Sequence, residues 1–380
     1  MSSDYRREFF DFEGVAYLAT ASEGPLPRVS AKAMQAAIEW KKMPHRIPDN
    51  AYFELPDRVR EKAAKFIGAD AEEMAVTTGA SAGMGVVAAG MNFQPGDEVV
   101  VAKGEFPAHF ATWVPYEKAG LVKVKVASPR ERFLTAEDYA AAIGPKTRLV
   151  SASYVRFDNG ARLDAKRVAD ACHKAGAALL LDLSQAVGVM PIDVRELGAD
   201  FAVISGYKWL LGPFGTGLFW IAREWQERLA LGPAYWMAAE GAENVSMLPG
   251  EGMELRPGAR RWDTAETAGP IHLMALEASL DFLLQLGVAE AARHTKSIVQ
   301  EVIERLPRDR YGVVSPLEEE NRGPYICLAA RRREETAAMY KKLREAGVIV
   351  SLRENALRVA PYLYSTSEDV TKLVKILAVA

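Results

Sequence analysis

The chain has 380 residues, of which 49% are hydrophobic and 26% charged, the composition of a globular protein with a large core. This length exceeds that of an average domain, so we expect two domains. The formal net charge is −3, with Lys and Arg scattered among Asp and Glu, which argues against a nucleic-acid partner.

The cysteine count and the N-terminus indicate the compartment. The two cysteines, Cys172 in a predicted helix and Cys327 in a predicted strand, have neither metal-ligand spacing nor the pattern of a disulfide framework. The N-terminus lacks the apolar core of a signal peptide, and no uncharged run reaches the roughly 20 residues that span a bilayer. We therefore expect a cytoplasmic protein with no membrane partner and no metal site.

The first segments predict an arm followed by two helices. An apolar run that begins at Phe12 reads as an edge strand, and Gly24, Pro25 and Pro27 then form a loop that could lie near a site. A helix is predicted over 30–42 with Ser30 as N-cap, and a second over 57–67.

A strand at 74–77 runs into Thr78-Gly-Ala-Ser-Ala-Gly83, where a helix rich in Ala, Val and Met begins. Small residues at such a turn let backbone N–H groups approach an anion, and the helix N-terminus adds its positive dipole. The turn is thus either a phosphate site around Ala80 and Ser81 or an ordinary N-capped turn.

Strands and helices then alternate, and the strands are apolar on both faces. This pattern predicts an α/β fold with a mostly parallel sheet between helices, in which ligands bind at the carboxyl ends of the strands. The predicted strands are 97–102, 121–127, 147–154, 177–183 and 201–205, with helices at 135–143 and 165–175.

Asp182 ends an apolar strand, Ala178-Leu-Leu-Leu-Asp182. A buried carboxylate is costly unless a cationic or protonated group pairs with it, and a pyridinium nitrogen is such a group. Gln185 could then donate a hydrogen bond to a phenolate oxygen of the same ring. The alternative is that Asp182 caps the following loop.

Lys208 lies in a loop of Ser, Gly and Pro directly after the strand 201–205. Its apolar neighbours favour partial desolvation, which disfavours the ammonium form and frees the amine to attack a carbonyl. Taken alone, a loop lysine is more often a solvated surface charge.

Phe106, at another predicted strand end, could stack on a flat ring or simply pack in the core.

The last third predicts a smaller α+β domain. Helices are expected at 271–286, 288–306, 334–346 and 367–377, and strands at 325–329, 348–351 and 356–359. We therefore predict a large domain over 25–265 and a small domain over 266–380, joined by an N-terminal arm over 1–24.

Together, the motifs Thr78-Gly-Ala-Ser81, Glu105-Phe-Pro, Asp182-Leu-Ser-Gln185 and Ser205-Gly-Tyr-Lys208 with its Gly-Pro-rich loop resemble the aminotransferase class V family of pyridoxal-phosphate (PLP) enzymes. The resemblance covers nearly the whole chain and implies fold type I, PLP as the cofactor and a homodimer.

The resemblance also implies individual roles. Lys208 would be the Schiff-base lysine and proton carrier, Asp182 would keep the pyridine nitrogen protonated, Gln185 would contact the ring oxygen, and Phe106 would stack on the ring. Arg358 would bind the substrate α-carboxylate. The phosphate would be bound by Ala80, Ser81, Ser205 and Tyr207.

Three departures from the family pattern bear on the reaction. The segment before Arg358 has no cysteine, so we do not expect a persulfide-type cysteine desulfurase. Arg156 and Phe157 stand where many members have an Asn. The segment 260–269 lacks the usual Gly-Thr-Pro, so either Thr264 or Thr267 replaces its contact with the partner subunit's phosphate, or that contact is lost.

The sequence predicts an aminotransferase acting on an amino-acid substrate, with a lyase or epimerase of the same family as the alternative. Three rivals remain. In a serine hydrolase, Ser81 would be the nucleophile with Asp182 and either His272 or His294. Ser205 and Lys208 could instead form an acyl-transfer pair, or the chain could bind the cofactor without catalysis.

Overall fold

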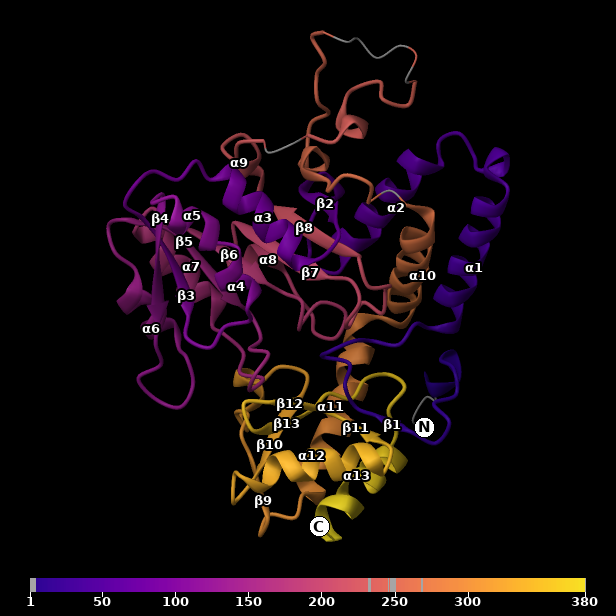
Figure 1. The fold of residues 1–380 in the computed structure, drawn as a ribbon, viewed down its shortest axis with the longest axis vertical. Coiled ribbons are helices and arrows are strands. Elements are labelled where there is room, and N and C mark those ends of the chain that lie inside the picture. The colour runs from indigo at the N-terminus through magenta and orange to yellow at the C-terminus, as the bar shows by residue number, and fades with distance from the viewer. Residues whose placement is uncertain (1–4, 232–233, 245, 247–250, 268, 380) are drawn as a thin grey trace.

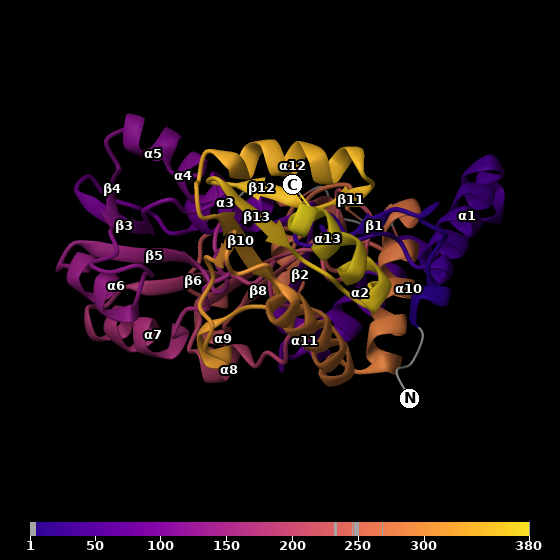
Figure 2. The same cartoon turned by 90° about the horizontal axis from the view of Figure 1, so that it is seen from below.

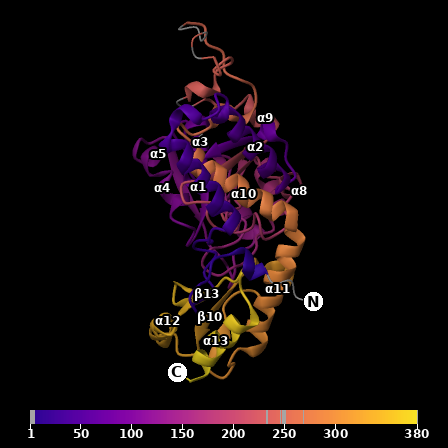
Figure 3. The same cartoon turned by 90° about the vertical axis from the view of Figure 1, so that its right-hand side faces the viewer.

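The computed structural model describes residues 5–231, 234–244, 246, 251–267 and 269–379, so the first four residues of the predicted arm lie outside it. Figure 1 shows a larger body built on a seven-stranded sheet and a smaller one built on a four-stranded sheet. Figure 3 shows the small body at one end of the molecule, with α11 (Val288–Arg305) along its side. The residue boundary between the two domains stays a prediction.

The large sheet has the strand order β2-β8-β7-β6-β5-β3-β4, and neighbouring strands from β7 to β4 are parallel. β8 is antiparallel to both β2 and β7. The α/β fold with a mostly parallel sheet is thus confirmed. The strands are β2 (Met74–Thr77), β3 (Asp97–Ala102), β4 (Val122–Ala127), β5 (Thr147–Ser153), β6 (Ala178–Asp182), β7 (Phe201–Ser205) and β8 (Gly217–Ile221).

Helices cover the faces of this sheet because the central strands are apolar on both sides. Every residue of β6, β7 and β8 is buried. α7 (Ala165–Lys174) shows how a covering helix is specified: Ala165, Val168, Ala169 and Cys172 form its buried stripe, and the Asp164 side chain caps its N-terminus. The other helices before residue 230 are α1 (Arg28–Lys42), α2 (Ala51–Lys65), α3 (Ala80–Gly90), α4 (Ala108–Ala111), α5 (Val114–Lys118), α6 (Ala136–Ala142), α8 (Val194–Leu197) and α9 (Arg223–Gln226).

Two helix starts differ from the prediction. Ser30 is not an N-cap: α1 begins at Arg28 with Pro27 at the cap, and the buried Ser30 hydroxyl lies 2.6 Å from that of Ser279. α2 begins upstream of Pro56, which was expected to precede the helix. Pro56 is the sixth residue of α2, so its missing N–H removes one interior hydrogen bond that the helix would otherwise make.

The small body contains β9 (Tyr311–Val313), β10 (Ile326–Ala330), β12 (Ser351–Arg353) and β13 (Ala356–Val359) in the order β12-β13-β10-β9. Ile326, Leu328, Leu357 and Val359 share one core with residues of α11, α12 (Glu335–Glu345) and α13 (Ser367–Val379). Seen from below, these helices lie around the small sheet (Figure 2). Because side chains alternate along a strand, Cys327 and Arg358 point to the opposite face.

Two connections join the bodies. β1 (Ala16–Tyr17) of the N-terminal arm pairs in parallel with β11 (Val348–Ile349) of the small body. α10 (Pro270–Leu286) packs on α1 and α2 of the large body, and the chain passes to α11 at Gly287. Within the described ranges no single helix is long and apolar enough to cross a membrane, and α10 and α11 pass that test only as a pair bent by 81°.

Candidate active site

The predicted site residues meet at the carboxyl edge of the large sheet. Asp182 ends β6, Ser205 ends β7, and Lys208 follows in the next loop. The Lys208 Nζ atom lies 5.5 Å from the centre of the Phe106 ring, which comes after β3, and 5.6 Å from the centre of the Tyr207 ring. The fold therefore places the Lys208 amine, beside Tyr207 of its own loop, next to the Phe106 ring from a separate loop.

Lys208 is 8% exposed. Burial lowers its pKa from 10.5 to about 8, because water no longer solvates the ammonium form. The Asp182 carboxylate opposes this fall, whereas the positive charges of Arg358 and Arg353 add to it. The side chain is thus suited to act as a neutral nucleophile and as a base near neutral pH.

The N-terminal arm lies directly over this lysine. The Gly24 N–H donates to the Tyr207 carbonyl over 2.9 Å, and a Cβ atom at Gly24 would lie 2.1 Å from the Lys208 carbonyl oxygen. A glycine is therefore required where the arm crosses the lysine loop. The loop expected near a site does lie beside Lys208.

Asp182 is 9% exposed and its main side-chain partner is His109. The sequence alone gave no indication that His109 belongs to the site. Burial alone would raise the pKa of Asp182, yet its pKa is lowered because His109, Lys208 and the Ser184 side chain stabilise the carboxylate. The His109 Nε2 atom lies 3.7 Å from Asp182 Oδ2, and its Nδ1 atom lies 2.8 Å from the Ser151 hydroxyl. Asp182 is thus anchored as an anion whose second oxygen faces a histidine.

A second buried carboxylate, Glu105, interacts electrostatically with His109. It accepts hydrogen bonds from the Ser153 hydroxyl at 2.7 Å and from its own neighbour, the Phe106 N–H, at 2.9 Å. Burial would raise the pKa of Glu105, but the charges of His109 and Arg156 lower it overall. The same carboxylate helps to keep the pKa of the buried His109 above its ordinary value.

Gln185 is buried and its amide is held at both ends. Its Nε2 atom donates to the Ala21 carbonyl, and its Oε1 atom accepts from the Trp209 indole N–H, both over 2.9 Å. These contacts fix the amide between the arm and the lysine loop. Its predicted contact with a ring oxygen stays a prediction.

The turn between β2 and α3 leaves backbone donors without partners. Gly79 occupies the N-cap and no side chain caps the helix. Among the described residues, the N–H groups of Ala80 and Ser81 have no acceptor, and Ser81 is exposed. Gly217 allows β8 to pass close behind, since a Cβ atom there would lie 2.4 Å from the Gly79 Cα. The turn is therefore able to receive an anion.

Ser205 lies at the end of the neighbouring strand and is linked to Ser184. Its N–H donates to the Ser184 hydroxyl over 2.9 Å, and that hydroxyl donates to the Ser205 hydroxyl over 3.2 Å. The Tyr207 ring lies against Phe214, 4.8 Å between centres. The phosphate contacts expected of Ser205 and Tyr207 stay predictions.

Arg358 occupies the other end of the site. It is 2% exposed, and its guanidinium donates to the Phe157 carbonyl over 2.9 Å and to the Ser22 hydroxyl over 2.7 Å. Its Nε atom has no hydrogen-bond partner among the described residues. Burial lowers its pKa, and no carboxylate of the described residues lies within 4 Å of it. A buried cation without a counter-ion is costly, so this position favours an anionic ligand.

The two residues that depart from the family pattern are already engaged. Arg156 pairs with Glu105 at 3.4 Å and with Asp158 at 3.1 Å, and it also donates to the Gly104 carbonyl. The Phe157 ring packs edge-on against Phe106, 5.3 Å between centres. Both therefore support the loop that carries Phe106.

The segment 260–269 packs on β2 of its own chain. The Thr264 N–H donates to the Val76 carbonyl over 3.0 Å, and the Thr267 hydroxyl donates to the Thr264 carbonyl over 2.6 Å. Ala268 lies outside the described residues. Whether either threonine reaches a partner subunit stays a prediction.

The hydrolase arrangement is not formed among the described residues. The histidine beside Asp182 is His109, and His294 donates instead to the Ser365 carbonyl over 3.1 Å. In the part of the chain that the structure describes, Ser81 makes no hydrogen bond to a histidine. The same part contains no group of three or more His, Cys, Asp or Glu side chains that could hold a metal ion.

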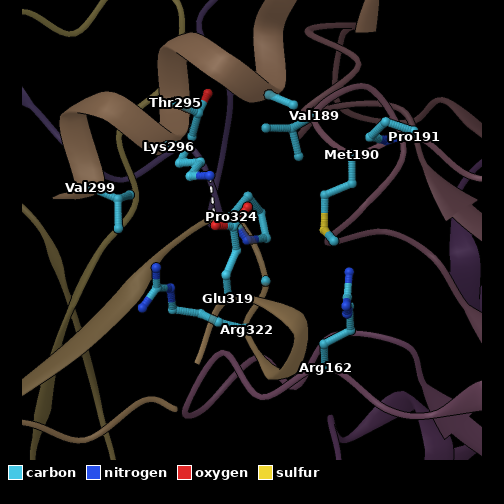
Figure 4. A pocket seen from close by; sticks show the side chains of 12 residues that line it. Arg162, Val189, Met190, Pro191, Thr295, Lys296, Val299, Glu319, Arg322 and Pro324 are labelled. Atoms are coloured by element: carbon cyan, nitrogen blue, oxygen red, sulfur yellow. Dashed lines mark ion pairs between the residues drawn. The ribbon is translucent and has the colours of Figure 1, made fainter. Parts of the chain in front are cut away.

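A separate cavity of about 320 Å³ lies where the loop 189–191 faces α11 and the segment 319–324 (Figure 4). The ion pair of Lys296 with Glu319, at 2.6 Å, lies along its wall. None of the predicted site residues lines this cavity.

Known proteins resemble this chain over nearly its whole length. The model of a family described as aminotransferase class-V matches residues 17–373. A probable cysteine desulfurase from Methanothermobacter thermautotrophicus is 28% identical over 98% of this chain and 96% of its own length. A kynureninase from Bacillus mycoides is 27% identical over 98% of this chain and 90% of its own length.

Solved structures show the same fold. A mutant of C-DES with glycine covalently linked to its PLP cofactor matches with a TM-score of 0.89 at 19% identity, covering 98% of this chain and 99% of that one. The likeness extends over both bodies of the molecule.

Proposed function

Because the chain belongs to the aminotransferase class-V family of PLP-dependent enzymes, we propose that it transfers the amino group of an amino acid to a 2-oxo acid, using PLP bound at Lys208. The observation that carries this proposal is the buried Lys208, whose pKa is lowered to about 8 and which interacts electrostatically with the Asp182 carboxylate and the Arg358 guanidinium.

The residues present fit PLP at its aldehyde carbon, its pyridine nitrogen, its ring face and its phosphate. Lys208 offers an amine for the aldehyde carbon, and the anionic Asp182 suits a protonated pyridine nitrogen. The Phe106 ring, 38% exposed beside Lys208, offers an apolar face. The unpartnered N–H groups at Ala80 and Ser81 suit the phosphate.

The bound cofactor supplies a ring that withdraws electrons from the substrate α-carbon. The protein's own groups do the rest. Arg358 would bind the substrate carboxylate through two N–H groups and so orient the α-carbon. As a neutral amine, Lys208 Nζ would accept the proton from that carbon, and Asp182 would hold a proton on the pyridine nitrogen.

The visible absorption spectrum tests the cofactor assignment. We expect purified wild-type protein supplied with PLP to show a visible band that changes when amino acids are added, and Lys208→Ala to lose that band. Lys174→Ala, which removes an exposed lysine of α7, serves as the matched control. A wild-type protein that takes up no PLP would refute the proposal.

Product analysis then tests the reaction. A panel of amino acids is incubated with a 2-oxo acid acceptor, and 2-oxo acid, ammonia and newly formed amino acid are measured. Formation of a new amino acid in step with the donor's 2-oxo acid is the expected result. Release of ammonia without a new amino acid would contradict transamination and support the second candidate, a lyase of the same family.

The relatives also include a probable cysteine desulfurase, but both cysteines of this chain are poorly placed for sulfur transfer. Cys172 and Cys327 are buried, and burial raises the pKa of each thiol to about 12. We therefore propose that the enzyme does not form a cysteine persulfide. If the enzyme releases sulfide from cysteine, the rate of release should be the same in Cys172→Ala and in Cys327→Ala as in wild type. Loss of sulfide release in either variant would contradict the proposal.

We also propose a cytoplasmic homodimer, as the family resemblance implies. Light scattering during size-exclusion chromatography would show twice the mass of one chain, and a single-chain mass would contradict it.

A further inference from the structure

A second arginine, Arg353, lies on the same face of the small sheet as Arg358. In the β12–β13 hairpin Ser351 is opposite Arg358, and Arg353 is opposite Ala356. Arg353 and Ser351 are two positions apart on one strand, so their side chains leave the sheet on the same side. This hairpin lies at the edge of the small body that faces the large one (Figure 1).

Both arginines converge on one hydroxyl of the N-terminal arm. Ser22 accepts from Arg358 over 2.7 Å and from Arg353 over 3.4 Å, and its hydroxyl lies 2.8 Å from that of Ser351. The neighbouring Ala21 carbonyl accepts from Gln185, and Gly24 crosses Lys208, so the arm places Ser22 at the active site. The Ser22 hydroxyl is fully used by these three contacts.

Within the described ranges of the chain, the two guanidinium groups have no carboxylate as a counter-ion. No carboxylate of the described residues, including the adjacent Glu354, lies within 4 Å of either one. Arg358 contrasts with Arg156, a buried arginine that is paired with both Glu105 and Asp158, whereas Arg353 is only partly buried. Arg353 uses one further N–H on the Leu352 carbonyl, which leaves the others free for a ligand.

Two like charges around one serine repel each other, and a ligand carboxylate on Arg358 neutralises only one of them. We propose that Arg353 binds a second anionic group of the substrate, so that the enzyme acts on amino acids with acidic side chains or on the matching dicarboxylic 2-oxo acids. This inference rests on the proposed function, because it assigns the α-carboxylate to Arg358.

The test compares ligands of equal chain length that differ by one carboxylate. Succinate is paired with butyrate, and glutarate with pentanoate, and each is titrated into the PLP-loaded enzyme by calorimetry. We expect the dicarboxylate of at least one pair to bind about tenfold more tightly or better, as a charge-assisted hydrogen bond implies. Arg353→Gln should abolish this preference while butyrate and pentanoate bind within about twofold of wild type.

Two further variants separate recognition from a structural role. Arg353→Lys keeps the charge and should retain part of the preference. Arg333→Gln removes an exposed arginine from the cavity of about 180 Å³ that Arg353 also lines, and should leave the preference unchanged. Equal weakening of both ligands by Arg353→Gln, or a wild-type enzyme without preference, would overturn the inference.

The visible band distinguishes this failure from failure of the proposed function. A wild-type protein that takes up no PLP refutes both proposals. A protein whose band responds to amino acids but whose binding ignores the second carboxylate refutes only the role of Arg353.

Discussion

The lowered pKa of Lys208 yields the sharpest quantitative prediction. At pH 7 a pKa of about 8 leaves about a tenth of the amine neutral, whereas the ordinary value of 10.5 would leave about 0.03%. Lys208 should therefore react about 300-fold faster than a solvated lysine of equal intrinsic nucleophilicity and access. The assay is competitive acylation of the cofactor-free protein with a trace of anhydride, followed peptide by peptide by mass spectrometry, with Lys174 as the internal reference.

Two substitutions should move the titration midpoint in opposite directions. Asp182→Asn removes a negative charge that holds the pKa of Lys208 up, so the midpoint should fall below about 8. Arg358→Gln removes a positive charge that holds it down, so the midpoint should rise. Partial unfolding would move the Lys208 midpoint of either variant toward 10.5. A lower midpoint in Asp182→Asn is therefore the result that unfolding cannot produce. A wild-type midpoint near 10.5 would refute the reasoning.

Three further changes probe the surroundings of the site. Lys208→Met should raise the free energy of unfolding of the cofactor-free protein at pH 7 by up to about 3 kcal/mol, because a buried ammonium is removed. Between about pH 8 and 10.5 the unfolded lysine binds more protons than the folded one, so the free energy of unfolding of wild type should rise relative to that of Lys208→Met. Urea titrations at pH 7 and pH 10 that give the same difference between the two proteins would contradict this. His109→Gln should weaken PLP binding about tenfold in equilibrium dialysis, because Asp182 loses its charged partner, and unchanged affinity would show that the pair does not matter. Gly24→Ala should lower the thermal midpoint by several degrees, because its Cβ would overlap the Lys208 carbonyl, whereas Gly85→Ala on open helix surface should not.

The central strands of the fold could be predicted because they are apolar on both faces, and their bounds differ from the expected ones by a residue or two. β8 could not, because Gly217–Ile221 follows a Gly- and Pro-rich loop and gives no local signal beyond a short apolar run. Ser30 looked like an N-cap, and only the packing of α1 on α10 shows that its hydroxyl is needed by Ser279. Local patterns failed where a distant element decides the contact.

The site shows the same division. Asp182 and Lys208 could be found because each is a charged residue placed directly beside apolar sequence, which is unusual without a partner. His109 could not, because its role depends on β3 and β6 presenting their ends to one another across β5. The signal available was Glu105, whose burial would demand a cation nearby. Glu105 belongs to the motif Glu105-Phe-Pro, in which Phe106 was the expected functional residue.

The charges at the site are separated along its length, and this separation connects the two proposals. Asp182 and Glu105 place negative charge at the end nearest the large sheet, with His109 between them. Arg358 and Arg353 place uncompensated positive charge at the end nearest the small sheet. Lys208 interacts electrostatically with the charges at both ends, so we expect an amino acid whose carboxylates face the arginines to present its α-carbon toward the lysine. A neutral side chain would leave Arg353 unpaired in that orientation, which is the physical reason why the second carboxylate should matter.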